Sequence, residues 1–156
     1  MKIQIMDKRL GSDWTLPQYK TDGSAGLDLR AMALSEHDCP LTIPITLDPG
    51  DTVLIGSGFA AEMPHGHAGF IFPRSGRGHK DGLVLGNGTG VIDSDYRGEI
   101  KVSAFNRHPT EAIEIVPGDR IAQLVIQPIA RPEFRIVESL DDTERGEFGF
   151  GSTGVR

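Results

Sequence analysis

The chain has 156 residues, a length that favours one domain with a self-sufficient core. Its net charge of -6 argues against nucleic acid or a membrane surface as a partner, because an acidic protein repels polyanions. The single cysteine, Cys39, excludes a disulfide framework and a multi-cysteine zinc site, and without a signal-like apolar run we expect a cytoplasmic protein.

Short strands between glycine and proline turns are the dominant pattern. Residues 1–10 alternate weakly and predict a first strand. The stretch AGLDLRA, residues 25–31, predicts a second one, with Leu27 and Leu29 on one face and Asp28 and Arg30 together on the other. An acid and a base side by side could also be an ordinary surface ion pair.

Two later segments share a Pro-Gly-Asp turn between apolar runs. The first turn is Pro49-Gly50-Asp51 within residues 41–63, and the second is Pro117-Gly118-Asp119 within residues 113–126. The pattern predicts two antiparallel hairpins. Between them, His65 and His67 could share a metal, although without a third ligand at a recognisable spacing a plain turn is the better interpretation.

The stretch PRSGRG, residues 73–78, combines charged donors with approachable backbone. Arg74, Ser75 and Arg77 lie among glycines, which are the components of an anion site, or of a basic turn. A helix is expected to be a turn or two at most, near His79.

Residues 86–99, GNGTGVIDSDYRGE, are the strongest candidate for chemistry. The turn at Asn87-Gly88 could close a hairpin, and Val91 and Ile92 are expected to pack inward. Asp93 then follows in apolar company, where the pKa of a carboxylate can rise and the group can act as a base. The alternative is a solvated turn.

The remaining chain completes a mostly β domain. Glu99–Asn106 alternates as a half-buried strand, and Gln123 lies among apolar neighbours, where its amide needs hydrogen-bond partners. A last apolar pattern over residues 132–140 is expected to complete the core. We therefore predict a single β domain over residues 1–140 and a glycine-rich C-terminal arm over residues 141–156. The arm is interpreted as a mobile lid rather than a disordered end.

Five stretches, in order, resemble the five motifs of the trimeric deoxyuridine triphosphate nucleotidohydrolases, the dUTPases, of bacterial type: AGLDLRA, PRSGRG, GNGTGVIDSDYRG, GDRIAQLVI and RGEFGFGSTG. The resemblance implies a β-clip or jelly-roll-like antiparallel barrel and a homotrimer with active sites at subunit interfaces. It also implies Mg²⁺-assisted conversion of dUTP and water to dUMP and pyrophosphate, which removes dUTP and supplies dUMP for thymidylate synthesis.

By the same resemblance, Asp93 would deprotonate the water that attacks the α-phosphorus, Gln123 would help hold that water, and Ser75 would lie near the leaving group. Asp28 would bind a water molecule that coordinates Mg²⁺, or would bind an arginine. The residues that would contact substrate are Arg74, Ser75, Gly76, Asn87, Gly90, Val91, Ile92, Tyr96, Lys101, Arg145, Phe150, Gly151, Ser152 and Thr153.

Within that set, the backbone of residues 90–92 with Asn87 would read uracil, and Tyr96 would exclude a ribose 2′-hydroxyl. Phe150 would stack on uracil, and Arg145 with Ser152 and Thr153 would bind the γ-phosphate.

Two residues depart from the family pattern. Arg77 lies where an apolar residue is expected, and Phe148 lies where many relatives have a smaller one. Two other functions stay open: a dCTP deaminase, which would need a glutamate near the position of Ser103, and a catalytically idle binding or structural trimer.

Overall fold

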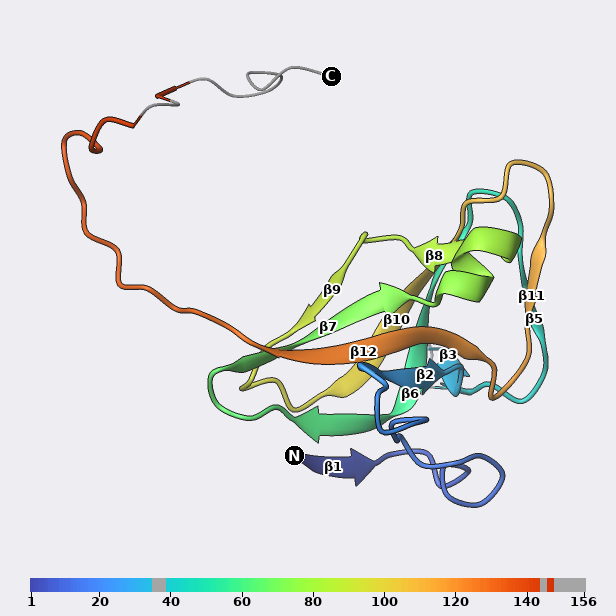
Figure 1. Ribbon diagram of the computed structural model, residues 1–156. Coiled ribbons are helices and arrows are strands. Elements are labelled where there is room, and N and C mark those ends of the chain that lie inside the picture. The colour runs from blue at the N-terminus through green and yellow to red at the C-terminus, as the bar shows by residue number, and fades with distance from the viewer. Residues whose placement is uncertain (35–38, 144–145, 148–156) are drawn as a thin grey trace.

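The computed structural model describes residues 1–34, 39–143 and 146–147 of the chain. Its named strands form three antiparallel sheets (Figure 1). The six-stranded sheet has the order β4-β3-β6-β10-β8, with β1 also paired to β6; the four-stranded sheet has the order β2-β12-β7-β9; and β5 pairs with β11. The mostly β, antiparallel architecture predicted from the sequence is confirmed.

The strands, with their bounds, are β1 (Lys2–Ile5), β2 (Gly26–Arg30), β3 (Ala33–Leu34), β4 (Cys39–Pro40), β5 (Ile45–Leu47), β6 (Thr52–Glu62), β7 (His67–Pro73), β8 (Leu83–Leu85), β9 (Gly90–Ile92), β10 (Glu99–Asn106), β11 (Ile113–Ile115) and β12 (Arg120–Pro128). The helical element is the short π-helical turn η1 (Arg77–Asp81), at the place where the sequence predicted one.

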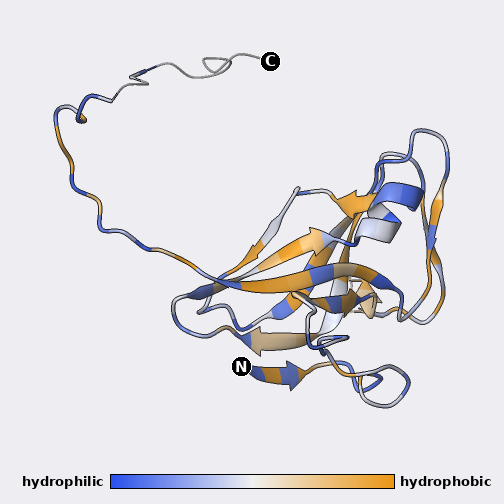
Figure 2. Ribbon diagram, viewed as in Figure 1, coloured by the Kyte–Doolittle hydropathy of each residue, from blue (hydrophilic) through white to orange (hydrophobic). Residues whose placement is uncertain are grey.

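Alternation along the strands explains the core. In β2 the side chains of Leu27 and Leu29 are buried, and β10 buries every second residue from Ile100 to Asn106. Both strands therefore match their prediction. Figure 2 shows hydrophobic residues along β7 and β12, and each fully buried aliphatic side chain contributes about 1.5–3 kcal/mol.

The two Pro-Gly-Asp turns form as predicted, but the prediction of hairpins is wrong. β5 and β11, which precede the turns, pair with each other, so that Ile113 lies opposite Leu47. Each turn instead delivers the chain into one of the larger sheets. The turn at Gly50 is fixed by a hydrogen bond from its N–H to the carbonyl of Asn106, and the turn at Gly118 by one to the carbonyl of Ala31. These long-range contacts redirect the chain.

The turn at Asn87-Gly88 also connects two sheets rather than closing a hairpin. Gly88 has a φ of 74° and its N–H donates to the carbonyl of Leu85 at 3.2 Å, which makes a tight turn. β8, before the turn, pairs with β10, whereas β9, after it, pairs with β7. The predicted turn is correct and the predicted pairing is not.

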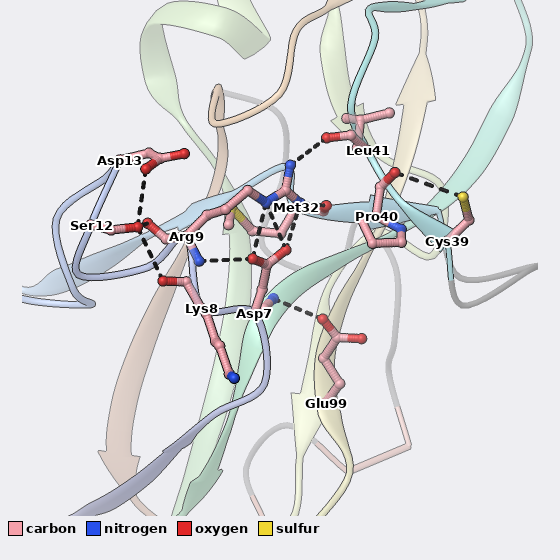
Figure 3. A network of polar contacts seen from close by, with 11 residues as sticks. Asp7, Lys8, Arg9, Ser12, Asp13, Met32, Cys39, Pro40, Leu41 and Glu99 are labelled. Carbon is pink, nitrogen blue, oxygen red and sulfur yellow. Dashed lines mark hydrogen bonds and ion pairs between the residues drawn. The ribbon is translucent and has the colours of Figure 1, made fainter.

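A network around Arg9 holds the N-terminal segment against the body (Figure 3). The Arg9 guanidinium donates to both carboxylate oxygens of Asp7 and to the carbonyls of Met32 (2.6 Å) and Leu41 (2.7 Å). The hydrogen bonds from Arg9 hold the pKa of Asp7 below its ordinary value, although burial acts in the opposite sense. Arg9 also lies 5.3 Å above the Trp14 ring, so one side chain joins three separate segments.

Beyond β12 the chain leaves the body as an extended segment (Figure 1). Phe134 is 96% exposed and Ile136 is 100% exposed, and Leu140 is also exposed. The prediction that residues 132–140 complete the core is therefore wrong for the single chain. These apolar side chains are therefore not covered by the body of their own chain.

No helix among the described residues is long and apolar enough to cross a membrane.

Candidate functional site

A cleft of about 510 Å³ opens where β2, β12 and the end of β7 meet. We call it the arginine cleft. Its lining residues are Lys20, Ser24, Ala25, Gly26, Asp28, Arg74, Ser75, Gly76, Arg120 and Gln123. Five of the predicted site residues are thus brought together here from three distant stretches of sequence: Asp28, Arg74, Ser75, Gly76 and Gln123.

Asp28 is the centre of this cleft. One of its carboxylate oxygens forms an ion pair with Arg74 Nε at 2.8 Å, and the other accepts a hydrogen bond from Arg120 Nη1 at 3.1 Å. Arg30, the neighbour that the sequence placed beside Asp28, instead donates to the carbonyl of Gly118 at 2.7 Å. Asp28 therefore holds two guanidinium groups at the edge of a cleft, and the positive charge that they carry suits an anionic ligand.

Gln123 is held in a defined orientation. Its amide nitrogen donates to the carbonyl of Pro73 at 3.0 Å, which meets the requirement for a hydrogen-bond partner that the sequence raised. Its amide oxygen lies directly over Gly26, where a Cβ would approach it to 3.0 Å. Glycine at this position thus leaves room for the amide, and the oxygen stays available to a ligand or water. Ser75 and Gly76 complete the cleft and are exposed.

A second, smaller depression of about 190 Å³ lies beside β9 and the start of β10. We call it the tyrosine depression. Its lining residues are Val91, Ile92, Asp93, Tyr96, Glu99 and Lys101. Asn87 and Gly90, which precede it in the chain, line neither depression; Asn87 is exposed in the turn, and Gly90 is buried against Ile71.

The Tyr96 side chain is fixed by its neighbours. Its hydroxyl donates to the carbonyl of Glu99 at 3.0 Å, and its ring covers Gly98, where any Cβ would overlap the ring. The Glu99 carboxylate in turn accepts from the N–H of Gly58 at 2.7 Å. The aromatic wall of the depression is therefore pre-organised by backbone contacts.

Ile92 packs against the core as expected, but the expectation that Val91 packs inward is wrong for the single chain. Val91 is 57% exposed and Asp93 is exposed as well. Within the part of the chain that the structure describes, β9 is the edge strand of its sheet and pairs with one neighbour, β7. An exposed apolar edge next to a carboxylate is a surface that another chain could cover.

The two depressions lie on opposite sides of β7. Gln123 on β12 pairs with Phe72, whereas Ile92 on β9 pairs with Gly69. From the strand spacing and rise, Gln123 and Ile92 are about 10 Å apart across the sheet and about 10 Å apart along it. Among the described residues none lines both depressions.

Comparison with known proteins identifies the family. The dUTPase family model matches residues 12–154. The chain is 52% identical over 155 residues to a deoxyuridine 5′-triphosphate nucleotidohydrolase of Hahella chejuensis, which covers 99% of this chain and 96% of that protein. A relative of the same name from Coxiella burnetii is 51% identical with the same coverage.

The chain belongs to the dUTPase family. Its fold agrees, because the Staphylococcus bacteriophage 80alpha dUTPase with dUPNHPP superimposes with a TM-score of 0.81 at 29% identity, covering 99% of this chain and 98% of the other. The jelly-roll class predicted from the motifs is therefore confirmed, and the chain is a dUTPase-type enzyme. The names of these relatives favour the hydrolase over a deaminase.

The fifth dUTPase motif lies mostly outside the described residues. This holds for Arg145, Phe148, Phe150, Gly151, Ser152 and Thr153.

Sequence reasoning missed three charged residues of this dUTPase surface: Lys20 and Arg120 in the arginine cleft, and Glu99 in the tyrosine depression. Arg120 directly follows a recognised turn, but only the pairing of β12 with β2 brings it to Asp28. Lys20 lies in a polar loop without a motif.

Arg77, one of the two departures from the family pattern, forms ion pairs and a hydrogen bond within the fold. It pairs with Asp81 at 3.0 Å and with Asp119 at 3.3 Å, and it donates to the carbonyl of Glu114 at 3.2 Å. It therefore ties η1 to the second Pro-Gly-Asp turn, whose Asp119 directly precedes the cleft residue Arg120.

Proposed function

We propose that the protein hydrolyses dUTP to dUMP and pyrophosphate in active sites that are shared between the subunits of a homotrimer. The observation that supports this proposal is that the residues assigned to the reaction lie in two separate depressions of one chain, Gln123 in the arginine cleft and Asp93 in the tyrosine depression. Asp93 and Gln123 are both assigned to the same water and phosphorus, yet β7 separates them. Their side chains are too short to meet across that distance.

A neighbouring copy solves this geometry. If the tyrosine depression of one subunit faces the arginine cleft of the next, Asp93 and Gln123 approach one phosphate from two chains. A closed ring of three such contacts gives three sites, as the family resemblance implies. The exposed edge at Val91 and the exposed side chains of Phe134 and Ile136 would be covered in the same assembly.

In the proposed reaction, Asp93 accepts a proton from a water while the water oxygen forms a bond to the α-phosphorus. The bond from that phosphorus to the bridging oxygen breaks, and pyrophosphate leaves with the electron pair. Arg74 and Ser75 bind the charge that accumulates on the leaving group, and Gln123 orients the water through its free amide oxygen. Asp28 contributes by holding the guanidinium of Arg74 in place.

Selectivity follows from the tyrosine depression. We propose that Asn87 and the backbone of residues 90–92 complement the edge of uracil, because cytosine presents donors where uracil presents acceptors. The Tyr96 ring is already fixed by the Glu99 carbonyl, so it would pack under deoxyribose and leave no space for a 2′-hydroxyl. Lys101, on the same wall, would contact the nucleotide from β10.

The residues of the arginine cleft are compatible with a Mg²⁺ ion that is coordinated mainly by the phosphates of the nucleotide. Each carboxylate oxygen of Asp28 already binds an arginine, so Asp28 would reach a cation only through water. A bound Mg²⁺ would neutralise charge on the phosphate oxygens, which are the hard ligands it prefers. Among the described residues no three acidic, histidine or cysteine side chains gather into a cage.

The arm over residues 141–156 is proposed to close the site. Phe150 would stack on uracil, Gly151 would allow close backbone approach, and Arg145 with Ser152 and Thr153 would bind the γ-phosphate. In a cytoplasmic setting the reaction would remove dUTP from the nucleotide pool and supply dUMP for thymidylate synthesis.

The proposal is tested by combining two inactive chains. Asp93→Asn and Arg74→Met should each lower turnover of dUTP at least a hundredfold, and Asp93→Asn should leave dUTP binding largely intact because it removes the base and not the pocket. When the two are refolded together as a 1:1 mixture, shared sites predict recovery of about a quarter of wild-type activity, because one site in four then receives both intact halves.

A mixture that stays inactive while wild-type chains refold to full activity would place the site within one chain. Loss of binding by Asp93→Asn, of the same size as its loss of turnover, would make Asp93 a structural residue.

A further inference from the structure

Lys20 is a cation of the arginine cleft to which none of the five motifs assigns a role. It lies in the loop between Trp14 and β2, it is exposed, and it lines the cleft together with Arg74, Arg120 and Gln123. Within the described part of the chain the Lys20 ammonium has no carboxylate partner, whereas both arginines are bound to Asp28. Its charge is therefore the least compensated in the cleft.

The backbone holds Lys20 in this position. An antiparallel bridge pairs Tyr19 with Leu27, and the register of an antiparallel pair then puts Lys20 opposite Gly26. Gly26 is the residue over which the amide oxygen of Gln123 lies. The backbone of Lys20 thus lies beside Gly26, next to the amide of Gln123 that is proposed to act at the reacting phosphate.

The loop after Lys20 is fixed as well. The N–H of Ser24 donates to the carbonyl of Thr21 at 3.0 Å, and the N–H of Thr21 donates to the Ser24 hydroxyl oxygen at 3.0 Å. These reciprocal bonds close a compact turn between Lys20 and β2. The base of the Lys20 side chain is therefore anchored on both sides, and its flexible stem carries an ammonium with three donors over the cleft.

We propose that Lys20 is a further phosphate-binding residue, whose ammonium contacts the triphosphate of the bound nucleotide. This inference rests on the proposed function and extends it to a residue outside the motifs. The cleft lining carries three cations, Lys20, Arg74 and Arg120, against one carboxylate, Asp28, so it attracts a polyanion. Lys20 is the cation of the cleft that is not paired with Asp28. Its flexible side chain can keep contact with the phosphates as pyrophosphate departs.

The test compares Lys20→Met with Lys20→Arg and with the control Lys8→Met. Methionine removes the charge and retains an unbranched stem, and arginine retains the charge. Lys8 is exposed and lines neither depression, so its substitution makes the same change in net charge elsewhere. Each variant is first checked for wild-type thermal unfolding and for wild-type oligomeric mass.

Titration calorimetry with dUMP and with inorganic pyrophosphate is followed by steady-state kinetics with dUTP at two salt concentrations. We expect Lys20→Met to weaken pyrophosphate binding and to raise KM for dUTP about tenfold, with a smaller change for dUMP and a weaker dependence on salt. Lys20→Arg should stay within about threefold of wild type.

Equal values for Lys20→Met and Lys8→Met would overturn the inference. A wild-type protein that binds pyrophosphate through Lys20 but does not hydrolyse dUTP would instead overturn the proposed function and leave the anion site standing.

Discussion

Asp28→Asn is expected to weaken both the fold and the active site, because one carboxylate holds two guanidinium groups. The substitution preserves the shape of the side chain and removes its charge. Arg74 and Arg120 then lose their ion pairs, at 2.8 Å and 3.1 Å. The two cations are left close together, and the amide offers one acceptor oxygen in place of two, so at most one guanidinium keeps a hydrogen bond there.

The size of the effect follows from how exposed the three side chains are. Asp28 and Arg74 are 28% and 29% exposed, and Arg120 is 42% exposed. Fully exposed pairs contribute about 0.2–1 kcal/mol each after screening, so these partly buried pairs should contribute about 1 kcal/mol each. The free energy of unfolding should therefore fall by about 2 kcal/mol in Asp28→Asn.

Catalysis should lose more than stability does. A misplaced guanidinium in a reacting site costs about a hundredfold, so kcat/KM for dUTP should fall by about that factor while the protein remains folded at 25 °C. Urea unfolding and steady-state kinetics measure the two effects separately. A cycle with Arg120→Met isolates the Asp28 to Arg120 pair, whose coupling energy should be about 1 kcal/mol. Wild-type stability and turnover in Asp28→Asn would refute the role given to this carboxylate.

Two further predictions concern the scaffold. Gly118→Ala should lower the free energy of unfolding in urea by at least about 3 kcal/mol, because φ is 84° there and a Cβ would overlap the Trp14 indole. The control Gly50→Ala, at φ 90° with open space around it, should lower it by only about 1 kcal/mol. Equal losses in the two variants would refute the packing argument. Hydrogen bonds from Arg9 lower the pKa of Asp7 in the folded state, so as the pH falls below 3.8 the carboxylate is protonated first in the unfolded state. The contribution of Asp7 to the free energy of unfolding is therefore fully present above that pH and is lost as the pH falls through the folded pKa. Asp7→Asn should be less stable at pH 7 and should show a shallower loss of unfolding free energy under acid, and a pH profile parallel to wild type would contradict this.

Local patterns in the sequence predicted the strands well because burial alternates with a period of two residues. Leu27 and Leu29 lie inward as expected, and so do the alternate residues Ile100, Val102 and Ala104 of β10. Glycine at the turns was also informative, since Gly88 and Gly118 both adopt positive φ. Each of these features depends on neighbours in sequence.

Pairing between distant segments could not be predicted in the same way. The partner of β11 is β5, and the N–H groups of the two Pro-Gly-Asp turns donate to the carbonyls of Asn106 and Ala31, which are far away in the chain. The Asp28 to Arg120 contact depends on the register of β12 against β2, which no local pattern specifies.

The apolar pattern of residues 132–140 was misinterpreted for a related reason. A sequence reveals that Phe134 and Ile136 require cover, but not whether their own chain supplies it. The exposure of Val91 has the same explanation if a second subunit faces it. The motif resemblance, rather than periodicity, grouped the predicted residues of both depressions into one site, but it did not include Lys20, Arg120 or Glu99.

The most direct test is a product assay of the wild-type protein with Mg²⁺ and, separately, dUTP, dCTP, dTTP and UTP, following pyrophosphate and ammonia. We predict pyrophosphate from dUTP alone, which would establish the reaction together with selectivity for uracil and for deoxyribose. Ammonia from dCTP, or no product from any nucleotide, would contradict the proposed function.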